Sequence, residues 1–381
     1  MNAPEPIQPI VAPMLPDRLL DKPSQPPALT ILVGQLGFSA PGAISLGQRN
    51  SVASLDFLDE NRLLFTFRVP GLVHRQTGEY EERQIRAVVL TLPSGAVEAE
   101  ALWTVHDRQR YLWMLKDGRF LLRDRENLDL GDAALELKPY LRFDGPLVWL
   151  EMDPTQQYLV TDSREQTATQ KPASDSDLAV RVLRRDSGQV MLVSHTRSTV
   201  HLPINSDGYL ENLRANGEGW LLNLHYFSGG SRILGEVDST CSPLFDFLSQ
   251  RHVLVTTCSP TGTGKLLVMT TSGRRLWEAQ TSAATLWPLV IMAANGTRLV
   301  REALALDHPV STRSTVDQSE IKGQLVEILD AADGRVELVT AASPVLDAGG
   351  NVTISPSGRR VAVLNGGTIQ VFDLPPPPLL P

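Results

Sequence analysis

The sequence has 381 residues, of which 42% are hydrophobic and 20% charged, and its formal net charge is −8. Lys and Arg never occur in a run longer than two residues. A phosphate-binding surface needs clustered positive charge, so nucleic acid is not expected as a partner. The longest apolar stretch, residues 286–294, is interrupted by Pro288. It is much shorter than the roughly 20 residues that cross a bilayer, so no transmembrane segment is expected.

Prolines are concentrated at the two ends of the chain. Residues 1–27 contain eight of them, and this composition favours extended, solvated backbone. We therefore expect a disordered tail at 1–27, a folded domain at 28–374 and a second proline-rich tail at 375–381. A signal peptide is not expected at Met1, because residues 1–27 contain no apolar run of the required kind. Two interpretations stay open: the protein is cytoplasmic, or its numbering begins after a removed leader and it is periplasmic or secreted.

One strand pattern recurs from residue 55 onward. Each repeat combines an alternating apolar strand, a tight polar turn and a strongly apolar strand. The turns contain Asn, Asp, Gly and Pro, which adopt the backbone angles that short hairpins require. The seven predicted hairpins span residues 55–67, 111–123, 148–160, 210–222, 245–257, 290–300 and 352–364.

Second hairpins with the same turn chemistry lie between these repeats, at 87–103, 179–195, 266–280 and 324–340. Two hairpins give one four-stranded antiparallel sheet per ~50 residues, which is typical of a propeller blade. The outermost strands of the blades at 111–143 and 209–240 cannot be placed from the sequence. The pattern predicts an all-β fold, a single seven-bladed β-propeller. An open two-sheet sandwich is the alternative.

The last repeat is one strand short, because only Thr368–Leu374 precedes the final prolines. We expect an N-terminal segment, either 29–34 or 42–46, to supply the missing outer strand. Pairing the first and last parts of the chain in this way closes the ring and removes an open sheet edge.

The units MDPTQQYLV (152–160) and ISPSGRRVAVLNGGTIQVFDL (354–374) resemble repeats of the WD40, YVTN and lactonase-like β-propeller superfamily. The resemblance covers roughly residues 30–374. The Trp-Asp and Gly-His dipeptides of regular WD40 blades are absent from every repeat. The resemblance therefore implies the fold and no particular role, because propellers serve in binding, scaffolding and catalysis alike.

No catalytic motif stands out in the sequence. Residues 259–265 (SPTGTGK) resemble a phosphate-binding loop, but Ser259 replaces the first glycine and Leu266 replaces the required Ser or Thr. We interpret the segment as a glycine-rich turn between strands. The seven histidines show no metal-binding spacing. No catalytic residue, cofactor or resident metal is assigned.

Polar residues at the predicted inner ends of the blades could still gather around the mouth of a central channel. They are His106, Asp107, Asp144, Asp207, Asp238 and Asp347. A ring of carboxylates could hold Ca²⁺ through oxygen ligands. Hydrogen bonds from each Asp to nearby backbone in turns are the other interpretation.

Three insertions lengthen the repeats, at 69–84, 161–177 and 301–322. Each falls between the predicted second and third strands of a blade, and connections of this kind emerge on one face. Insertions on one face of a repeat fold are typical of a binding side, although tolerant loops also collect them. We expect a monomer that binds a protein or a small ligand there without catalysis. The alternatives are a propeller enzyme, lactonase-like or quinoprotein-like, and an envelope-associated structural protein.

The two cysteines, Cys241 and Cys258, flank the predicted inner hairpin of the fifth repeat. If paired residues have numbers that sum to 499, Phe245 faces Leu254 and the two cysteines face each other. This register predicts a disulfide, whereas a one-residue change in the turn would send the side chains to opposite faces. Because disulfides persist mainly in oxidising compartments, the pairing favours an exported protein.

Overall fold

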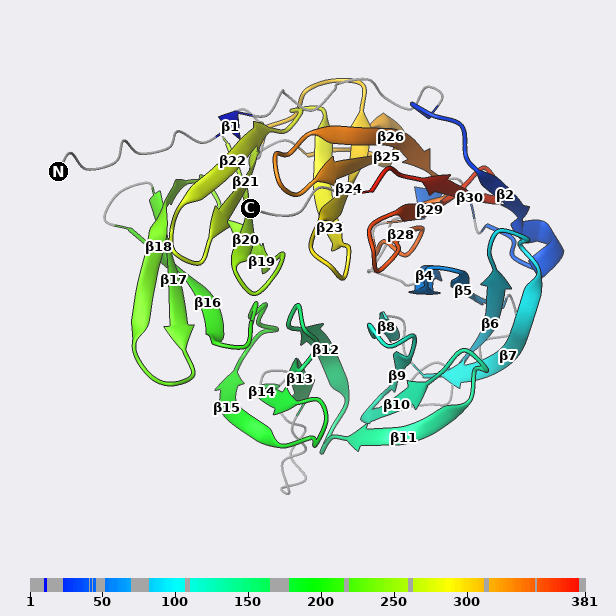
Figure 1. The fold of residues 1–381 in the computed structure, drawn as a ribbon, viewed down its shortest axis with the longest axis horizontal. Helices are drawn as coiled ribbons and strands as arrows, with labels where there is room; N and C mark the ends of the chain where they lie inside the picture. The colour runs from blue at the N-terminus through cyan, green and yellow to red at the C-terminus, as the bar shows by residue number, and fades with distance from the viewer. Residues whose placement is uncertain are drawn as a thin grey trace.

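The computed structural model describes residues 10–11, 23–40, 42, 44–45, 52–69, 82–106, 110–164, 178–215, 219–259, 263–311, 315–346 and 348–376. Seven antiparallel sheets surround a central axis (Figure 1), which confirms the predicted seven-bladed β-propeller. We number the blades in chain order. Among the described residues no helix has the length and apolar character needed to cross a membrane.

The first three blades each contain four strands in chain order. Blade 1 contains β4 (Ala53–Asp59), β5 (Arg62–Arg68), β6 (Arg83–Thr91) and β7 (Val97–Val105). Blade 2 contains β8 (Leu112–Met114), β9 (Phe120–Asp124), β10 (Asn127–Gly131) and β11 (Leu137–Arg142). Blade 3 contains β12 (Leu147–Met152), β13 (Tyr158–Arg164), β14 (Leu178–Arg184) and β15 (Val190–Thr196).

The remaining blades complete the ring. Blade 4 contains β16 (Gly208–Arg214), β17 (Gly219–Tyr226) and β18 (Ser231–Asp238), and blade 5 contains β19 (Leu244–Phe247), β20 (His252–Thr257), β21 (Lys265–Thr270) and β22 (Arg275–Gln280). Blade 6 contains β23 (Thr285–Met292), β24 (Arg298–Leu306), β25 (Ile321–Asp330) and β26 (Val336–Ala342). Blade 7 contains β28 (Val352–Ile354), β29 (Arg360–Asn365) and β30 (Thr368–Asp373). Two short 3-10 helices, η1 (Val33–Leu36) and η2 (Gln318–Glu320), lie outside the sheets.

The turn chemistry read from the sequence explains the hairpins. Gly358 ends the Ser-Pro-Ser-Gly turn between β28 and β29 with φ of 71°, a left-handed conformation that favours glycine. A Cβ atom at this position would lie 3.0 Å from Thr297 Oγ1 of the neighbouring blade. Glycine is therefore required both for the backbone angle and for the close packing of two blades.

An N-terminal strand closes the ring. Strand β2 (Leu29–Leu32) pairs antiparallel with β30, so that Leu29 lies opposite Val371 and Ile31 opposite Ile369. Figure 1 shows this blue strand beside the red end of the chain. Closure therefore uses the first of the two predicted segments. In the second, Ile44–Ser45 (β3) instead pairs in parallel with β27 (Val345–Leu346).

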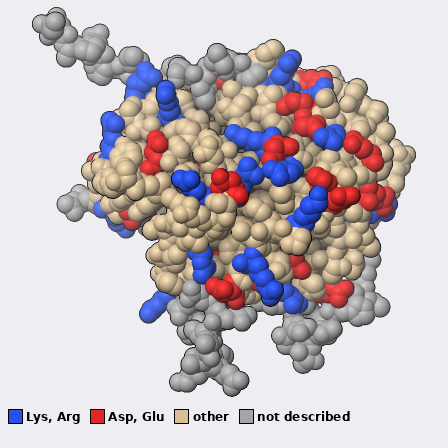
Figure 2. Space-filling model, turned by 60° about the horizontal axis from the view of Figure 1, so that its bottom comes forward, with Lys and Arg blue, Asp and Glu red and all other residues tan. Residues whose placement is uncertain are grey.

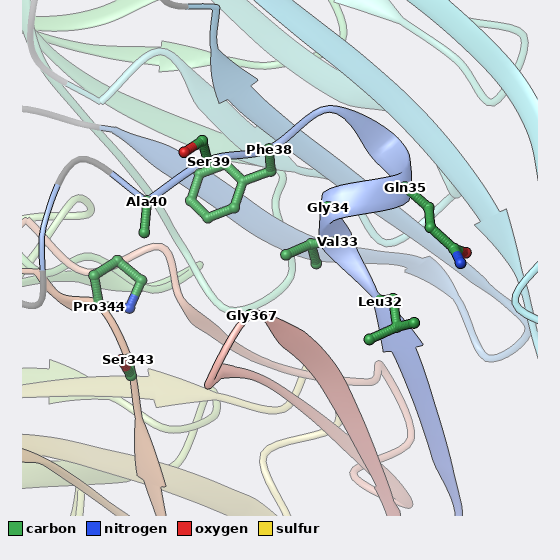
Figure 3. Close-up of a pocket in the computed structure, with 10 residues that line it drawn as sticks. All are labelled: Leu32, Val33, Gly34, Gln35, Phe38, Ser39, Ala40, Ser343, Pro344 and Gly367. Atoms are coloured by element: carbon green, nitrogen blue, oxygen red, sulfur yellow. The ribbon is translucent and has the colours of Figure 1, made fainter.

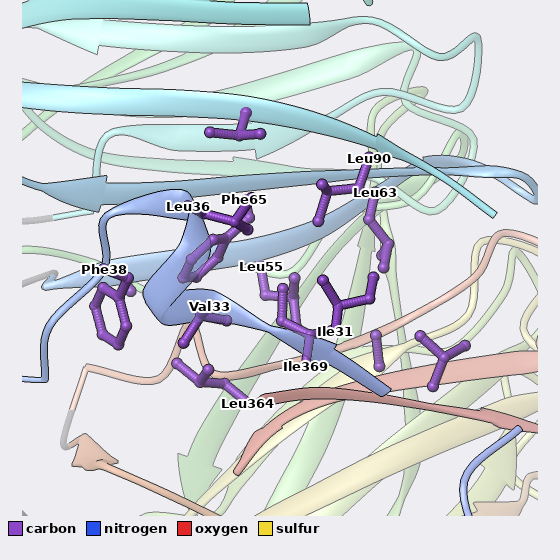
Figure 4. Close-up of a cluster of buried hydrophobic side chains, with 14 of the residues drawn as sticks. Ile31, Val33, Leu36, Phe38, Leu55, Leu63, Phe65, Leu90, Leu364 and Ile369 are labelled. Atoms are coloured by element: carbon purple, nitrogen blue, oxygen red, sulfur yellow. The ribbon is translucent and has the colours of Figure 1, made fainter. Parts of the chain in front are cut away.

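Apolar side chains from the N-terminal segment fill the space between blades 7 and 1 (Figure 4). Ile31, Val33, Leu36 and Phe38 pack among buried residues of both blades, including Phe65 of β5. The Phe38 and Phe65 rings lie 5.4 Å apart with an edge-to-face tilt of 73°. Burial of these side chains stabilises the closed ring by roughly 1.5–3 kcal/mol for each large residue.

Blade 4 differs from the sequence-based prediction. The predicted hairpin 210–222 exists as β16 and β17, but these are not the two innermost strands of the blade, and β18 is the outermost strand that the sequence left unplaced. Pro203 O accepts a hydrogen bond from Leu210 N at 2.9 Å, on the edge of β16 that β17 leaves open. Asn205 Nδ2 donates to Gln250 O in the first turn of blade 5. The irregular segment 200–205 therefore takes the innermost position, and β16 is the second strand.

The first turns of the blades bond to one another on one face, which we call the turn face. Ser357 N donates to Glu60 Oε1 at 2.7 Å, and Lys116 N donates to Gln156 Oε1 at 2.6 Å. The second strands of blades 1, 3 and 6 are β5, β13 and β24. Because successive strands are antiparallel, these strands end on the opposite face, which we call the insertion face. The predicted insertions begin too early at 161 and 301, since β13 extends to Arg164 and β24 to Leu306, and their residues 70–81, 165–177 and 312–314 lie outside the described part of the chain.

The N-terminal segment also contacts the outer strands of blades 5 and 6. Strand β1 (Ile10–Val11) pairs in parallel with β22. Ser24 N donates to Val339 O of β26 at 3.0 Å, and Val339 N donates to Ser24 Oγ at 3.0 Å. Together with β2 on β30, these contacts cover part of the outer edge of three successive blades.

Candidate functional site

The predicted channel-mouth residues do not share one environment. His106 follows β7, and its Nδ1 lies 2.9 Å from Asp124 Oδ2. Asp144 precedes β12 and contacts Arg181 at 3.7 Å, with 87% of its side chain exposed. Asp238 ends β18, while Asp207 lies in the turn before β16, on the turn face.

Asp107 and Asp347 lie outside the described residues. Within the described ranges, no group of three or more His, Cys, Asp or Glu side chains has an arrangement suited to a metal ion. The described members of the predicted ring therefore make separate local contacts, and the ring itself stays a prediction.

A polar cluster that the sequence did not reveal lies at the inner side of blades 3 to 5. It consists of Glu151 of β12, His201 of the 200–205 segment and Asp246 of β19. His201 Nδ1 hydrogen-bonds Glu151 Oε1, while Nε2 lies 2.9 Å from the Phe245 carbonyl and 3.5 Å from Asp246 Oδ1. Because both ring nitrogens face acceptors, the imidazole donates from both and is held as a cation.

The charges of this cluster depend on one another. Partial burial opposes the positive charge of His201, but the hydrogen bond to Glu151 and the charges of Glu151 and Asp246 outweigh it and raise the pKa of His201 to about 9. Loss of surrounding water raises the pKa of Asp246 to about 6, against the opposing charge of His201. The ion pairs of the cluster therefore hold the irregular segment 200–205 of blade 4 against β12 of blade 3 and β19 of blade 5.

His201→Gln should lower the melting temperature at pH 6 and should change it little at pH 10. The folded pKa of His201 lies above its ordinary value of 6.5. The contribution of the charged His201 to the free energy of unfolding is therefore complete below pH 6.5 and is lost as the pH rises through about 9. Thermal unfolding of both proteins across this range tests the expectation. A difference in melting temperature that stays constant with pH would contradict it.

A cavity of about 500 Å³ lies beside the closing strand (Figure 3). It is lined by residues that follow β2, including Val33 and Phe38, and by Ser343 and Pro344. No ionisable side chain is among its lining residues. The cavity is therefore a gap in the packing of the closure and offers no group for acid–base chemistry.

Strand β15, the outer strand of blade 3, exposes a continuous run of apolar side chains. Four successive apolar residues are 40–47% exposed: Val190, Met191, Leu192 and Val193. Neither Lys, Arg, Asp, Glu nor Pro occurs in the strand. An uncharged, exposed edge strand is a template for pairing with another chain, and contiguous exposed apolar surface is typical of interaction sites.

The other outer strands carry the features that discourage such pairing. Strand β7 has Glu98 and Glu100, β11 has Lys138 and Pro139, and β18 has Arg232 and Glu236. The outer edges of blades 5, 6 and 7 receive the N-terminal segment. Charges, proline and coverage are the usual protections of a sheet edge. Strand β15 has none of them among the described residues.

Blade 5 shows how such an edge can be occupied in this protein. In β22 the extra residue of a β-bulge precedes Trp277, and Ile10 and Val11 pair with Trp277 and Glu278. In β15 the extra residue of the corresponding bulge precedes Leu192. Leu192 and Val193 therefore occupy the positions at which β22 accepts an added strand.

Basic residues lie at both ends of β15. Arg184, next to the turn that leads into the strand, is exposed, and so is Arg197, which follows its last residue. Asp186 contributes one exposed negative charge in the turn. On the face shown in Figure 2, acidic and basic side chains are interspersed, without a large patch of one sign.

Cys241 and Cys258 lie side by side, with Cα atoms 5.6 Å apart and sulfur atoms at bonding distance. The register of the two strands between the cysteines differs from the predicted one. Phe245 pairs with Val255 and not with Leu254, so the numbers of paired residues in β19 and β20 sum to 500. Thr240 N donates to Cys258 O ahead of β19. This hydrogen bond lies outside the paired part of β19 and β20 and follows a different register, which places Cys241 beside Cys258.

The oxidised protein is expected to show no titratable thiol after denaturation without reductant. Cys241→Ser should then lower the free energy of unfolding by about 3 kcal/mol, because a bridge across a loop of this size restricts the unfolded chain. In the presence of reductant the variant and the unsubstituted protein should unfold together. Two titratable thiols in the untreated protein would contradict the pairing.

Comparison with known proteins shows a likeness in fold. No family model matches the chain, and no curated protein matches it. An acylaminoacyl peptidase from Pyrococcus horikoshii is similar with a TM-score of 0.48 and 11% identity over 85% of this chain and 53% of the peptidase. The chain thus spans about half the length of that enzyme.

Two further solved structures are similar over most of their own length. Hydrazine synthase from Kuenenia stuttgartiensis gives a TM-score of 0.45 and 11% identity, covering 89% of this chain and all of that one. The WD40 propeller domain of Doa1 gives a TM-score of 0.44 and 11% identity, covering 87% and 95%. At this level of identity the likeness concerns the fold alone.

Proposed function

We propose that this protein is a non-catalytic binding propeller and that its ligand is another protein. The observation that carries the proposal is the exposed apolar outer strand β15, which has neither the charges nor the proline of other outer strands and which no other described residue covers. Keeping four apolar side chains in water is unfavourable, and a protein interface removes this cost by burying them.

The second strand of blade 3, β13, ends at Arg164 on the insertion face, where the predicted insertion 161–177 continues the chain. The partner is expected to contact the rim of this blade first and to extend onto that face, where β5 and β24 also end. Loops held by a rigid scaffold are frequent binding elements. The protein is expected to be a monomer in the absence of its partner.

A photoreactive amino acid placed at position 192 of the full-length protein tests this function in extracts of its native source. We expect a specific covalent adduct with another protein. The matched control is position 233 of β18, because Ile233 is also an outer-strand residue and is 60% exposed. Equal labelling from both positions, or none from position 192, would contradict protein binding at blade 3.

We infer in addition that the protein works in an oxidising compartment, periplasmic or secreted. The support is the position of Cys241 beside Cys258, which suits a disulfide. Thiol titration of the protein taken directly from cells decides this point, since a protein kept in a reducing compartment would show both thiols.

A further inference from the structure

We propose that β15 binds an extended, uncharged apolar segment with acidic residues at its ends, by adding that segment as a fifth strand to blade 3. This inference rests on the proposed function and specifies the chemistry of the partner. In strand addition, main-chain hydrogen bonds provide affinity, and the side chains of the added strand provide specificity.

The geometry of the added strand follows from blade 5. There the backbone of Ile10 and Val11 pairs with the two residues that come directly after the bulge of the outer strand. Leu192 and Val193 come directly after the equivalent bulge in β15. They are 40% and 47% exposed, so an extended segment can reach this edge.

The side chains of β15 define the character of the segment. Its apolar residues run from Val190 to Val193, and no side chain from Val190 to Thr196 is Lys, Arg, Asp or Glu. A charged residue in the core of the added strand would lose water without gaining a partner. The core of the bound segment is therefore apolar and uncharged.

The ends of β15 define the flanks of the segment. Exposed Arg184 and Arg197 stand at opposite ends of the strand, so acidic residues on both sides of the apolar core gain favourable contacts. A second copy of this chain fits less well. Antiparallel pairing of two β15 strands would bring Arg197 of each copy towards Arg184 of the other, and like charges repel.

The test uses the full-length protein and three short synthetic peptides. The first has a valine-rich core with glutamates at both ends, the second has the same core with lysines at both ends, and the third has a proline in the core. We expect saturable binding of the first peptide and slower hydrogen exchange at β15. The lysine-ended peptide should bind about tenfold more weakly, and the proline peptide should not bind, because its core lacks a required N–H.

Variants on the protein side complete the test. Leu192→Lys places a charge on the edge and should abolish binding of the glutamate-ended peptide, and Arg184→Glu with Arg197→Glu should reverse the preference between the two flanks. Ile233→Lys on β18 is the matched control and should bind as the unsubstituted protein does. All of these positions are exposed, so the variants are expected to fold.

Three outcomes would overturn the inference. They are unchanged hydrogen exchange at β15 with saturating peptide, equal binding by Leu192→Lys, and a dimer of the full-length protein that Leu192→Lys dissociates. The last would identify a second copy as the occupant. If the peptides fail while position 192 still cross-links another protein, strand addition is wrong and protein binding at blade 3 stands.

Discussion

Ile31→Asp should lower the free energy of unfolding by at least about 4 kcal/mol. Ile31 is 9% exposed in the closing strand β2 and lies within the cluster between blades 7 and 1. The substitution removes a large apolar side chain and brings a carboxylate into its place. Denaturant unfolding measures the loss, which also reports how strongly the N-terminal strand holds the ring together.

Leu32→Asp provides the matched control for this prediction. Leu32 is the next residue of the same strand, but it is 54% exposed. Its substitution should cost less than about 1 kcal/mol. Equal losses for the two variants would show that β2 does not bury its inner face, and the closure would then be wrong.

Glu302→Gln should remove a large pH dependence of stability. Glu302 of β24 is 1% exposed, and neither carboxylate oxygen has a hydrogen-bond partner among the described residues. Burial raises its pKa from 4.5 to about 8. Below pH 4.5 both folded and unfolded forms are protonated, whereas above it only the unfolded form ionises readily. The native protein should therefore lose stability from pH 4.5 to 8, by up to about 5 kcal/mol.

The measurement is denaturant unfolding of both proteins between pH 4 and 9. The curve of Glu302→Gln should be flatter than that of the unsubstituted protein, and the two curves should lie close together near pH 4.5 and diverge as the pH rises towards 8, where the variant is the more stable protein. Glu98→Gln, at an exposed position of β7, should run parallel to the unsubstituted protein. Parallel curves for Glu302→Gln as well would show that Glu302 is ionised in the fold at little cost.

The fold could be predicted because its signals are local. Period-2 alternation and turns such as that ending at Gly358 repeat often enough to give hairpins, blades and their number. The closure followed from the missing strand of the last repeat, and Leu29–Leu32 supplies it. Blade 4 was misplaced because its innermost segment, 200–205, has no strand pattern. Contacts with blades 3 and 5 hold this segment in place.

The candidate site could not be predicted for two physical reasons. The sequence of residues 190–193 resembles a buried strand, and only its position as the outer strand of blade 3 exposes it among the described residues. His201 meets Glu151 and Asp246 across long sequence separations, so no spacing indicates the cluster. The predicted register around the cysteines was wrong for a separate reason, because a change in turn length shifts the pairing by one residue.

Hydrogen exchange of the full-length protein, alone and in the complex isolated from its native source, tests the binding surface most directly. We expect the amides of β15 to exchange more slowly in the complex, and those of β7, with its exposed Glu98 and Glu100, to exchange as before. Unchanged exchange at β15 in a complex that protects another part of the propeller would contradict the assignment of blade 3 as the binding site.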